Sequence, residues 1–479
     1  MDVDNFAFAT LRRAYEHPDR LAASGNAQVS YQRFADLTVH FARRMREFGV
    51  DRSSTIGFQL KSPLVAVVAA TAVAVLGAKW IGGRPRGLPG YVPQPTHVFA
   101  GMGESEAGAY EFTRAWFEAP PTRLADLSDF DGHASADDMW LIAHSSGTTG
   151  RPKHMPLTYA QAWRRVVDNA DLVDGKPMTL CSLFEPVSYV GIRPRLGNLF
   201  HGGTNVSTTS LERLPELGVN RVMGSPSHLV AFLKGKSPPP VRIRSCRLTG
   251  AAVTRRFVEH LFGYFEEVQV LYGSTEAGAV ALAQFFDAAS FDGSAGPAMD
   301  GAAFDIVDQA GEPVPTGSEG IVRVRAAGMI SGYLGEPELT RSLFRDGWFT
   351  PGDLGRVGAA GALYITGRTG EVINLAGLKL NAADLDEVLQ LHADVDDGYC
   401  FIAKDEAGAD VLAAVVSLRP GANPADAVAI REVAARGLAA AKVLKRVYVV
   451  DTVLRNENGK PMRAESARAA QDWIPIELA

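Results

Sequence analysis

The fold of this chain is constrained most by short β-branched segments that alternate with helical patterns. Strand-like segments lie at Arg221–Met223, Arg242–Leu248 and Val268–Leu271, and helical patterns such as Arg255–Phe265 separate them. This alternation is typical of a largely parallel sheet, because parallel neighbours need a crossover that is usually a helix. The sequence therefore predicts an α/β fold with helices on the faces of its sheets.

Two helices are predicted in the N-terminal part of the chain. Apolar residues recur at three- and four-residue steps across Tyr31–Phe48, where Ser30 can cap the start and Gly49 can end the helix. The Ala- and Val-rich segment Leu64–Ala78 is shorter than the ~20 residues that span a bilayer. It is therefore expected to be a buried core helix, and no membrane span is predicted.

The sequence changes character after Gly320, where β-type segments are separated by glycines. After Arg368 a separate unit is predicted, with strands and one helix at Cys400–Ala403, Val411–Leu418, Ala425–Lys442 and Val447–Val450. This mixture of elements predicts a smaller α+β domain.

Composition excludes several classes of protein. The 479 residues carry 48 Lys and Arg against 54 Asp and Glu, a formal net charge of −6, so no nucleic-acid partner is expected. Cys181, Cys246 and Cys400 are far apart, which fits the reducing cytoplasm rather than a disulfide-bonded or zinc-binding protein. The N-terminus has early acidic residues and no apolar stretch, so no secretory signal is expected and a cytoplasmic location is predicted.

A segment rich in Gly, Ser and Thr, Ser145–Lys153, reads SSGTTGRPK and directly follows the apolar run Met139–Ala143. Glycines let a backbone approach a ligand, hydroxyl and N–H groups donate hydrogen bonds, and Lys153 supplies charge, so the segment could cradle phosphate oxygens. It differs from the common triphosphatase loop because Pro152 precedes the lysine. A flexible surface loop is the alternative.

Further motifs follow in order at Tyr272–Glu276, Thr350–Asp353, Tyr364–Arg368 and Asn458–Lys460. Together the motifs resemble those of the acid-adenylating superfamily of acyl- and aryl-CoA synthetases, peptide-synthetase adenylation domains and luciferases. The resemblance extends from about Val29 to Arg463. It implies a large N-terminal domain, residues 1–369, with two doubly wound sheets and a β-barrel-like part. A small mobile α+β domain, residues 370–479, would follow and carry the catalytic lysine.

The resemblance also implies a reaction. A small-molecule carboxylic acid would be joined to the α-phosphate of ATP with Mg²⁺ as cofactor, and pyrophosphate would leave. The acyl group would then pass to a thiol, for which coenzyme A is the expected co-substrate. Because two anions must meet, such a site needs positive charge, a metal ion and hydrogen-bond donors.

The residues expected to bind ATP or AMP match the family's motifs and are Ser145, Ser146, Gly147, Thr148, Thr149, Gly150, Lys153, Gly250, Ala251, Ala252, Tyr272, Gly273, Ser274, Thr275, Asp353, Arg368 and Lys460. Among them Thr148, Thr149 and Lys153 would hold the β- and γ-phosphates. Glu276 would bind Mg²⁺, which prefers oxygen ligands. The resemblance implies Lys460, Thr149 and Glu276 as catalytic residues.

The resemblance assigns the other contacts individually. Tyr272 would stack on adenine, Asp353 would accept both ribose hydroxyls with help from Arg368, and Lys460 would bridge the carboxylate and the α-phosphate. Taken singly, Tyr272 could be a half-buried strand aromatic, Asp353 a turn residue and Lys460 a solvated hairpin lysine. The shared order of the motifs favours the functional interpretation.

Family members alternate between two domain arrangements, one for adenylation and one for thiol transfer. Gly370 stands at the hinge position, where the family usually has Asp or Lys, and Gly377 matches the loop that lines the thiol tunnel. Leu454 and Ala382 replace prolines that are common in the family. These departures bear on thiol transfer more than on adenylation.

The acid pocket is expected at Glu185, Tyr189, Gly250, Gly273, Ala277 and Gly278. If Glu185 is buried it needs a partner, which could be a substrate amine, or Arg193 or Arg195 in a structural salt bridge. The small residues could make room for an aryl or medium-sized acyl acid, with a fatty chain as the alternative. Tight strand packing would explain them equally well.

Three alternatives to coenzyme A ligation stay open. The acceptor could be a carrier-protein thiol acting in trans, an amine, or absent altogether. The acid could be an unusual one that bears an amine. A non-catalytic nucleotide-binding homologue is the third alternative. The oligomeric state does not follow from the sequence.

Overall fold

The computed structural model describes residues 5–477, except for 83–87, 107, 131–134, 146–151, 168–171, 174–175, 370–371, 376–377, 390–391, 406–407, 420, 424–427, 433–443 and 456–460. The chain forms two compact units. The first consists of Met1–Gly250, Arg255–Phe304 and Arg323–Pro351, and the second of Ala251–Thr254, Asp305–Val322 and Gly352–Ala479. Because residues 370 and 371 lie outside the description, the domain boundary at 370 stays a prediction.

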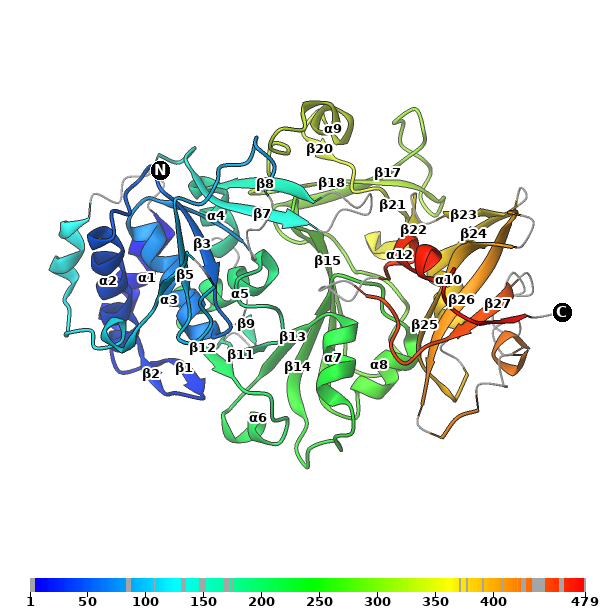
Figure 1. Cartoon of the computed structure of the whole chain (residues 1–479), viewed down its shortest axis with the longest axis horizontal. Coiled ribbons are helices and arrows are strands. Elements are labelled where there is room, and N and C mark those ends of the chain that lie inside the picture. Colours follow the sequence, from blue (N-terminus) through cyan, green and yellow to red (C-terminus); the bar gives the residue numbers. More distant parts are fainter. Residues whose placement is uncertain are drawn as a thin grey trace. The chain divides into compact units, whose positions relative to one another are not determined.

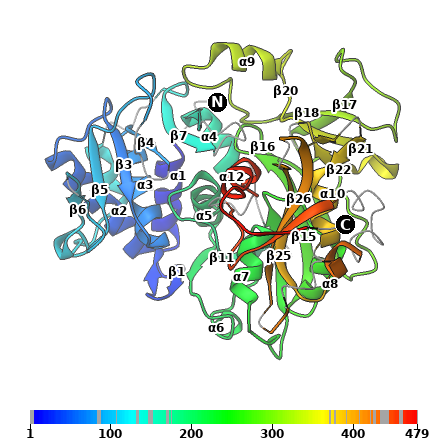
Figure 2. The same cartoon turned by 45° about the vertical axis from the view of Figure 1, so that its right-hand side comes forward.

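A six-stranded sheet of the first unit has the order β6-β5-β3-β4-β7-β8. Its strands are β3 (Thr55–Gln59), β4 (Lys79–Ile81), β5 (His97–Ala100), β6 (Tyr110–Glu111), β7 (Met139–Ser145) and β8 (Lys153–Thr158). Every pairing is parallel except that of β7 with β8. The helices and 3₁₀ turns around it are α1 (Phe6–Glu16), α2 (Tyr31–Glu47), α3 (Pro63–Val75), α4 (Tyr159–Val166), η1 (Arg114–Trp116) and η2 (Leu124–Asp129). Figures 1 and 2 show α1, α2 and α3 beside strands β3 and β5.

The helices of this layer follow from the sequence signals that predicted them. In α2 the hydroxyl of Ser30 accepts a hydrogen bond from the N–H of Arg33, and Gly49 beyond the end has a φ of +89°. In α3 Pro63 occupies the first turn and Ser62 caps it. Residues Ala66 to Val75 are all buried, so the prediction of a core helix is confirmed. Among the described residues no helix is both long and apolar enough to cross a bilayer.

An eight-stranded sheet has the order β16-β15-β14-β13-β11-β12-β1-β2. Its strands are β1 (Leu21–Gly25), β2 (Val29–Ser30), β11 (Thr179–Ser182), β12 (Thr204–Ser207), β13 (Arg221–Gly224), β14 (Ile243–Thr249), β15 (Phe265–Ser274) and β16 (Gly278–Phe285). Only the two end pairings, with β2 and with β16, are antiparallel. The helices are α5 (Tyr189–Phe200), α6 (Arg213–Glu216), α7 (Pro226–Leu233) and α8 (Arg255–Leu261), and a short pair is formed by β9 (Leu172–Val173) and β10 (Lys176–Pro177). Two mostly parallel sheets confirm the predicted α/β class.

The predicted helix Arg255–Phe265 is too long by one turn. Helix α8 ends at Leu261, and Phe265 is already the first residue of β15, fully buried and paired with Ile243. Burial of the aromatic ring in the sheet outweighs the helical spacing that the sequence showed.

The β-rich part after β16 forms a further sheet. Its strands are β17 (Ala302–Val307), β18 (Gly320–Ala326), β19 (Phe344–Arg345), β20 (Trp348–Phe349), β21 (Asp353–Val357) and β22 (Leu363–Arg368). The helix α9 (Pro337–Leu343) and the 3₁₀ turn η3 (Ala359–Gly361) lie between these strands in the sequence. Strand β18 contributes to both units. Its residue Val324 pairs with Phe349 in the first, while Gly320 and Ile321 pair with β21 in the second.

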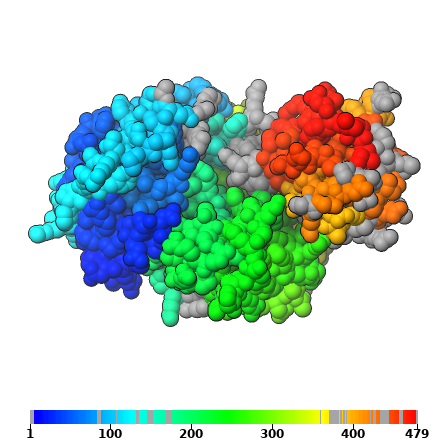
Figure 3. All heavy atoms as spheres, turned by 60° about the horizontal axis from the view of Figure 1, so that its bottom comes forward, coloured from blue at the N-terminus to red at the C-terminus, as the bar shows by residue number. Residues whose placement is uncertain are grey.

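The C-terminal part of the second unit is α+β, as predicted. It contains the hairpin β23 (Val372–Leu375) and β24 (Leu378–Asn381), the helices α10 (Ala382–Leu389) and α12 (Arg463–Ala469), and the sheet of β25 (Val395–Lys404), β26 (Asp410–Leu418), β27 (Leu444–Val449) and β28 (Pro475–Glu477). Of the predicted helix Ala425–Lys442, residues 428–432 are helical and most of the others lie outside the description. In the space-filling view the atoms of the N-terminal part of the chain, in blue and cyan, gather in one region of the face shown (Figure 3).

Candidate functional site

The ends of the predicted phosphate-binding segment are placed by the antiparallel pair β7–β8. The apolar run Met139–Ala143 lies within β7, and Ser145 pairs with Lys153 at the open end of the hairpin. Ser146, Gly147, Thr148, Thr149 and Gly150 lie outside the described residues, as does the side chain of Ser145. The hairpin therefore fixes where the segment begins and where Lys153 follows it.

Glu276 lies in the turn between β15 and β16, and its carboxylate is held by a neutral donor. The phenol of Tyr333 donates a hydrogen bond of 2.8 Å to Glu276 Oε1. Tyr333 is 6% exposed, and its burial, followed by the charge of Glu276, raises its pKa well above the usual value. The phenol therefore stays protonated at physiological pH and acts as the donor to Glu276.

Lys153 reaches the same place from β8. Its ammonium nitrogen lies 5.2 Å from the centroid of the Tyr333 ring, within the range of a cation–π contact. The structure thus brings together Lys153 and Glu276, which the sequence predicted, through Tyr333, which it did not. The sequence offered no signal for Tyr333, because 57 residues separate it from Glu276.

Arg165 of α4 holds the backbone of the β15–β16 turn. No sequence motif predicted this role. Its guanidinium donates to the carbonyl oxygens of Thr275 (2.8 Å), Glu276 (2.7 Å) and Gly328 (2.8 Å). It also donates to the hydroxyl of Tyr189 at 2.7 Å. With 2% exposure, Arg165 is a buried brace that fixes the backbone carrying Glu276 and joins it to Tyr189 of the predicted acid pocket.

A single carboxylate at this turn suits Mg²⁺, which is usually bound by one or two carboxylates together with substrate phosphates. Among the described residues no group of three or more His, Cys, Asp or Glu side chains forms a metal cage. The predicted role of Glu276 as a Mg²⁺ ligand stays a prediction.

Tyr272 and Gly250 lie at the carboxyl ends of adjacent parallel strands. Thr249 of β14 pairs with Leu271 of β15, so Gly250 and Tyr272 are the next residues along each strand. Ligands of open α/β sheets bind at this edge. Tyr272 is half-buried, and Gly250, Ala251 and Ala252 are exposed, which leaves their predicted nucleotide contacts open to test.

The small residues of the β15–β16 turn are explained at least partly by their own backbone. A Cβ atom on Gly273 would lie 2.2 Å from the carbonyl oxygen of Gly278, and Gly278 has a φ of +83°. The hydroxyl of Ser274 accepts the N–H of Ala277 at 3.1 Å, and Ala277 is buried. Tight packing of the turn therefore accounts for Gly273, whatever acid is bound.

Glu185 is exposed, which corrects the expectation that it might be a buried charge. Arg195, one of its two suggested partners, is 3% exposed, and its guanidinium donates to the carbonyl oxygens of Gly191 (2.5 Å), Ser182 (2.7 Å) and Phe184 (3.3 Å). Burial lowers the pKa of Arg195 to about 10. Because water reaches Glu185, its charge does not require a substrate amine.

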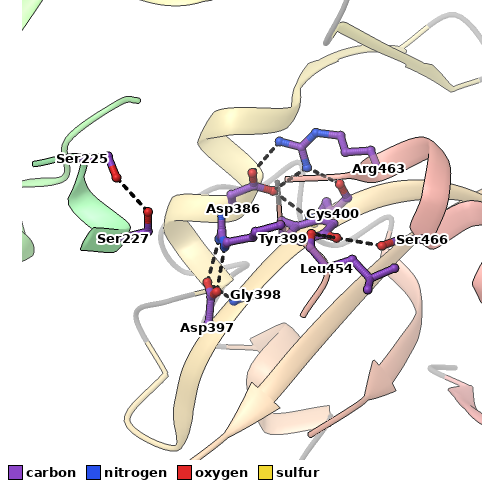
Figure 4. Close-up of polar contacts among 11 residues, drawn as sticks. Ser225, Ser227, Asp386, Asp397, Gly398, Tyr399, Cys400, Leu454, Arg463 and Ser466 are labelled. Atoms are coloured by element: carbon purple, nitrogen blue, oxygen red, sulfur yellow. Dashed lines mark hydrogen bonds and ion pairs between the residues drawn. The ribbon is translucent and has the colours of Figure 1, made fainter. Parts of the chain in front are cut away.

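The N-terminus of α7 carries a serine–histidine contact. The hydroxyl of Ser225, the N-cap of α7, lies 2.9 Å from Ser227 Oγ (Figure 4). It lies 2.7 Å from Nδ1 of His228. Burial lowers the pKa of His228, which favours the neutral ring in its hydrogen bond with the Ser225 hydroxyl. This pair caps the helix and orients the ring beside Phe184, whose centroid is 5.1 Å away.

In the second unit the structure brings together Asp353 and Arg368, the residues predicted to hold the ribose. They are cross-strand partners on β21 and β22, and Arg368 Nε donates to Asp353 Oδ1 at 2.6 Å. Asp353 is 7% exposed. Lys460, Gly370 and Gly377 lie outside the described residues, so their predicted roles stay predictions.

The sequence of this chain is similar to those of known AMP-binding enzymes and CoA ligases. Residues 100–334 match a family described as AMP-binding enzyme. The chain is 26% identical over 480 residues to the 2-succinylbenzoate–CoA ligase of Geobacillus kaustophilus, covering 95% of this chain and 96% of the ligase. It is 28% identical over 346 residues to the oxalate–CoA ligase of Arabidopsis thaliana, covering 68% of this chain and 66% of that ligase.

Solved structures share the fold. ATP-bound MatB from Rhodopseudomonas palustris superposes with a TM-score of 0.80 at 19% identity, covering 98% of this chain and 99% of that chain. The amide bond synthetase McbA from Marinactinospora thermotolerans gives 0.79 at 20% identity, covering 96% and 99%. At such identities the likeness is one of architecture.

Proposed function

Because the chain belongs to the acid-adenylating superfamily, we propose that it is an AMP-forming acid–thiol ligase that couples a carboxylic acid to coenzyme A. The observation that supports this most is the group of Lys153, Tyr333 and Glu276 beside the SSGTTGRPK segment. It combines a cation for phosphate oxygens with a charged carboxylate for the metal ion, which are the groups that two approaching anions require.

In the first half-reaction a carboxylate oxygen of the acid attacks the α-phosphorus of ATP, and the bond to the β-phosphate breaks to release pyrophosphate. We assign Thr148, Thr149 and Lys153 to the β- and γ-phosphates and Lys460 to the charge that builds up between carboxylate and α-phosphate. Mg²⁺ bound at Glu276 would supply charge neutralisation of the phosphates. Tyr333 and Arg165 keep Glu276 and its backbone in place.

Nucleoside binding is assigned to two groups of residues. Tyr272, with Gly250–Ala252, would contact the adenine, and Asp353 would accept the ribose hydroxyls while Arg368 orients it. In the second half-reaction the thiol attacks the acyl carbon and AMP leaves, with Gly370 as the hinge and Gly377 in the thiol tunnel. The three cysteines are free and buried. From these reduced thiols and from the proposed substrates ATP and coenzyme A, we infer that the protein acts in the cytoplasm.

The substrate proposal is an aryl or medium-sized acyl acid. Exposure of Glu185 supports plain acids over amine-bearing ones. A different acceptor, either an amine or a carrier-protein thiol in trans, is the second candidate, since Leu454 and Ala382 replace prolines that are common in the family near the catalytic lysine and the thiol loop.

The test is pyrophosphate release from Mg²⁺-ATP over a panel of aryl, fatty and amino acids, with and without coenzyme A. We expect acid-dependent release from the wild type, a loss of about 100-fold or more in Lys460→Ala, and a thioester detected by mass. Lys445→Ala, which removes an exposed lysine of β27, is the matched control and should behave as the wild type. Release without a thioester would favour another acceptor, and no release with any acid would contradict the proposal.

A further inference from the structure

The segment that carries Lys460 is closed at its base by its own flanking residues. Residues 456–460 lie outside the described part of the chain, but both ends are described. Arg455 and Pro461 form an antiparallel bridge, and the N–H of Met462 donates to the carbonyl oxygen of Leu454 at 3.1 Å. The position of this base therefore decides where the lysine segment starts and ends.

The residue before the segment is fixed by a two-point ion pair. Arg455 donates through Nε and one terminal nitrogen to the two carboxylate oxygens of Asp397, both at 2.7 Å (Figure 4). The side chains are 20% and 32% exposed. Paired hydrogen bonds of this kind restrict the direction of the guanidinium as well as its distance.

Arg463, the third residue after the segment, is fixed in the same way from another element. Arg463, the first residue of α12, donates to both oxygens of Asp386 on α10, at 3.1 and 2.5 Å, and to the carbonyl oxygen of Cys400. The N–H of Cys400 in turn donates to Asp386 at 2.7 Å. The exposed fractions of the two side chains are 15% for Asp386 and 18% for Arg463.

Tyr399 connects the two arginines. Each guanidinium lies 5.5 Å from the centroid of its ring. Its hydroxyl is 2.6 Å from the carbonyl oxygen of Leu454, to which it donates, and 2.7 Å from the hydroxyl of Ser466. We call the set of Asp386, Asp397, Tyr399, Arg455 and Arg463 the loop clamp.

Stabilisation of the unit is a weak reason for such a cluster. Partly buried ion pairs lose in desolvation much of what they gain in attraction, and apolar side chains of equal volume often stabilise as well or better. What charged pairs provide is a defined geometry. A lysine that acts in a transition state needs this, because a displacement of about 1 Å can lower a rate by about 100-fold.

We propose that Asp386 and Asp397 are positioning residues for Lys460, each holding one of the arginines that flank its segment. The inference rests on the adenylation proposed above for Lys460. It assigns to α10 and β25, neither of which carries a residue predicted to touch the substrates, a direct influence on the rate of acyl-adenylate formation. It also explains why two separate elements, α10 and β25, converge on Leu454, Arg455 and Arg463.

The first test compares Asp397→Asn, Asp386→Asn and Asp386→Glu with the wild type in acid-dependent pyrophosphate release. We expect kcat to fall about 10- to 100-fold in the two Asn variants, with KM for ATP and acid within twofold, and a partial recovery in Asp386→Glu. Glu465→Gln is the control, since it breaks only an exposed ion pair with Arg468 on α12. A purely structural role would lower the melting temperature and leave kcat per folded molecule unchanged, which would overturn the proposal.

The second test does not depend on activity. Hydrogen exchange of the amides from Leu454 to Met462 should accelerate at least tenfold in Asp397→Asn, and should not change in Glu465→Gln. If the wild type released no pyrophosphate with any acid, the proposed function would fail while this readout still reported on the clamp. Unchanged exchange in both Asp variants would refute the clamp even in an active enzyme. Asp397 is the more exposed of the two acids, so its variant should fold even if Asp386→Asn does not.

Discussion

Glu276 in the first unit and Asp386 in the second are both shielded carboxylates, but different kinds of donor hold them. Glu276 accepts a hydrogen bond from the neutral phenol of Tyr333. Asp386 accepts from the charged guanidinium of Arg463 and from the N–H of Cys400. A neutral donor orients a carboxylate and leaves its charge available to a ligand, whereas a guanidinium cancels that charge within the protein. The two regions thus differ in whether the protein itself supplies a counter-charge to the carboxylate.

Replacement of Glu276 by Gln should have the largest effect on activity. The amide keeps the size of the side chain and can still accept from Tyr333, but it loses the charge that attracts Mg²⁺. We expect kcat/KM for adenylation to fall about 100-fold or more, with little change in stability. The measurement is pyrophosphate release at several Mg²⁺ concentrations. Glu266→Gln, which lies on β15 and pairs at the surface with Arg244, is the control. A loss below threefold would remove Glu276 from the site.

Replacement of Arg463 by Ala should have the largest effect on stability. At pH 8 it leaves the Asp386 charge shielded from water without a counter-charge, which costs about 3 kcal/mol of unfolding free energy. At pH 5 the loss should be smaller, because Asp386 can take up a proton. Urea unfolding at the two pH values measures both. An equal loss at the two pH values would mean that packing, rather than charge, is what Arg463 contributes.

The pH dependence of activity should distinguish the two carboxylates. Burial is the main influence on Asp386 and raises its pKa from 3.8 to about 6, while Arg463, the N–H of Cys400 and Arg455 oppose the rise. Because the folded pKa is the higher one, the stability linked to this proton is complete below pH 3.8 and is lost as the pH rises through 6. Acidification therefore removes the charge of the clamp without loss of stability from Asp386.

We accordingly expect kcat for adenylation to fall about tenfold between pH 7 and pH 5, with an apparent pKa near 6. The cationic groups facing Asp386 are Arg463 and Arg455, and neither loses its proton between pH 5 and pH 7. Burial raises the pKa of the adjacent Cys400 thiol well above its usual value, so the thiol does not titrate in this pH range either. In Asp386→Asn the fall in kcat between pH 7 and pH 5 should be missing. If kcat of the variant still fell over this pH range, the titration would belong to another group.

Replacement of Tyr333 by Phe should have the smallest effect. It removes one neutral hydrogen bond to Glu276 but keeps the ring on which Lys153 lies. A contribution of about 1 kcal/mol corresponds to about a fivefold increase in the Mg²⁺ concentration at half-maximal rate. Tyr264→Phe, which removes a hydrogen bond of 2.7 Å to the carbonyl oxygen of Lys236, controls for the loss of a tyrosine hydroxyl. A change as large as that of Glu276→Gln would mean that the phenol itself contacts the substrate.

Local signals in the sequence predicted much of the fold. The hydroxyl of Ser30 and the glycine at 49 act within one turn of the chain, so the predicted helix Tyr31–Phe48 matches α2 to within one residue. The predicted helix Leu64–Ala78 matches α3 less well, because α3 already ends at Val75. The helix from Arg255 failed at its end, where Phe265 belongs to a strand. There the partner that decides the structure is Ile243 of β14, which lies outside the local pattern.

The residues of the candidate site also fall into two groups, those that a sequence motif predicted and those that no motif predicted. Lys153, Glu276, Asp353 and Arg368 could be identified because each lies in a short motif whose order was recognisable. The exposure of Glu185 could not be predicted, since it depends on where the chain after β11 turns outward. Arg165 and Tyr333 carry no local motif, and they reach Glu276 from 111 and 57 residues away.

The sequence by itself therefore determined the α/β class, the helices of the first unit and the superfamily, because these depend on periodicity, capping and motifs within short stretches of chain. Only the tertiary structure decided which donor holds each carboxylate. A phenol from the segment after β18 meets Glu276, and an arginine from α12 meets Asp386 on α10. The charge that remains on a buried acid is set by neighbours that folding brings together from distant parts of the chain.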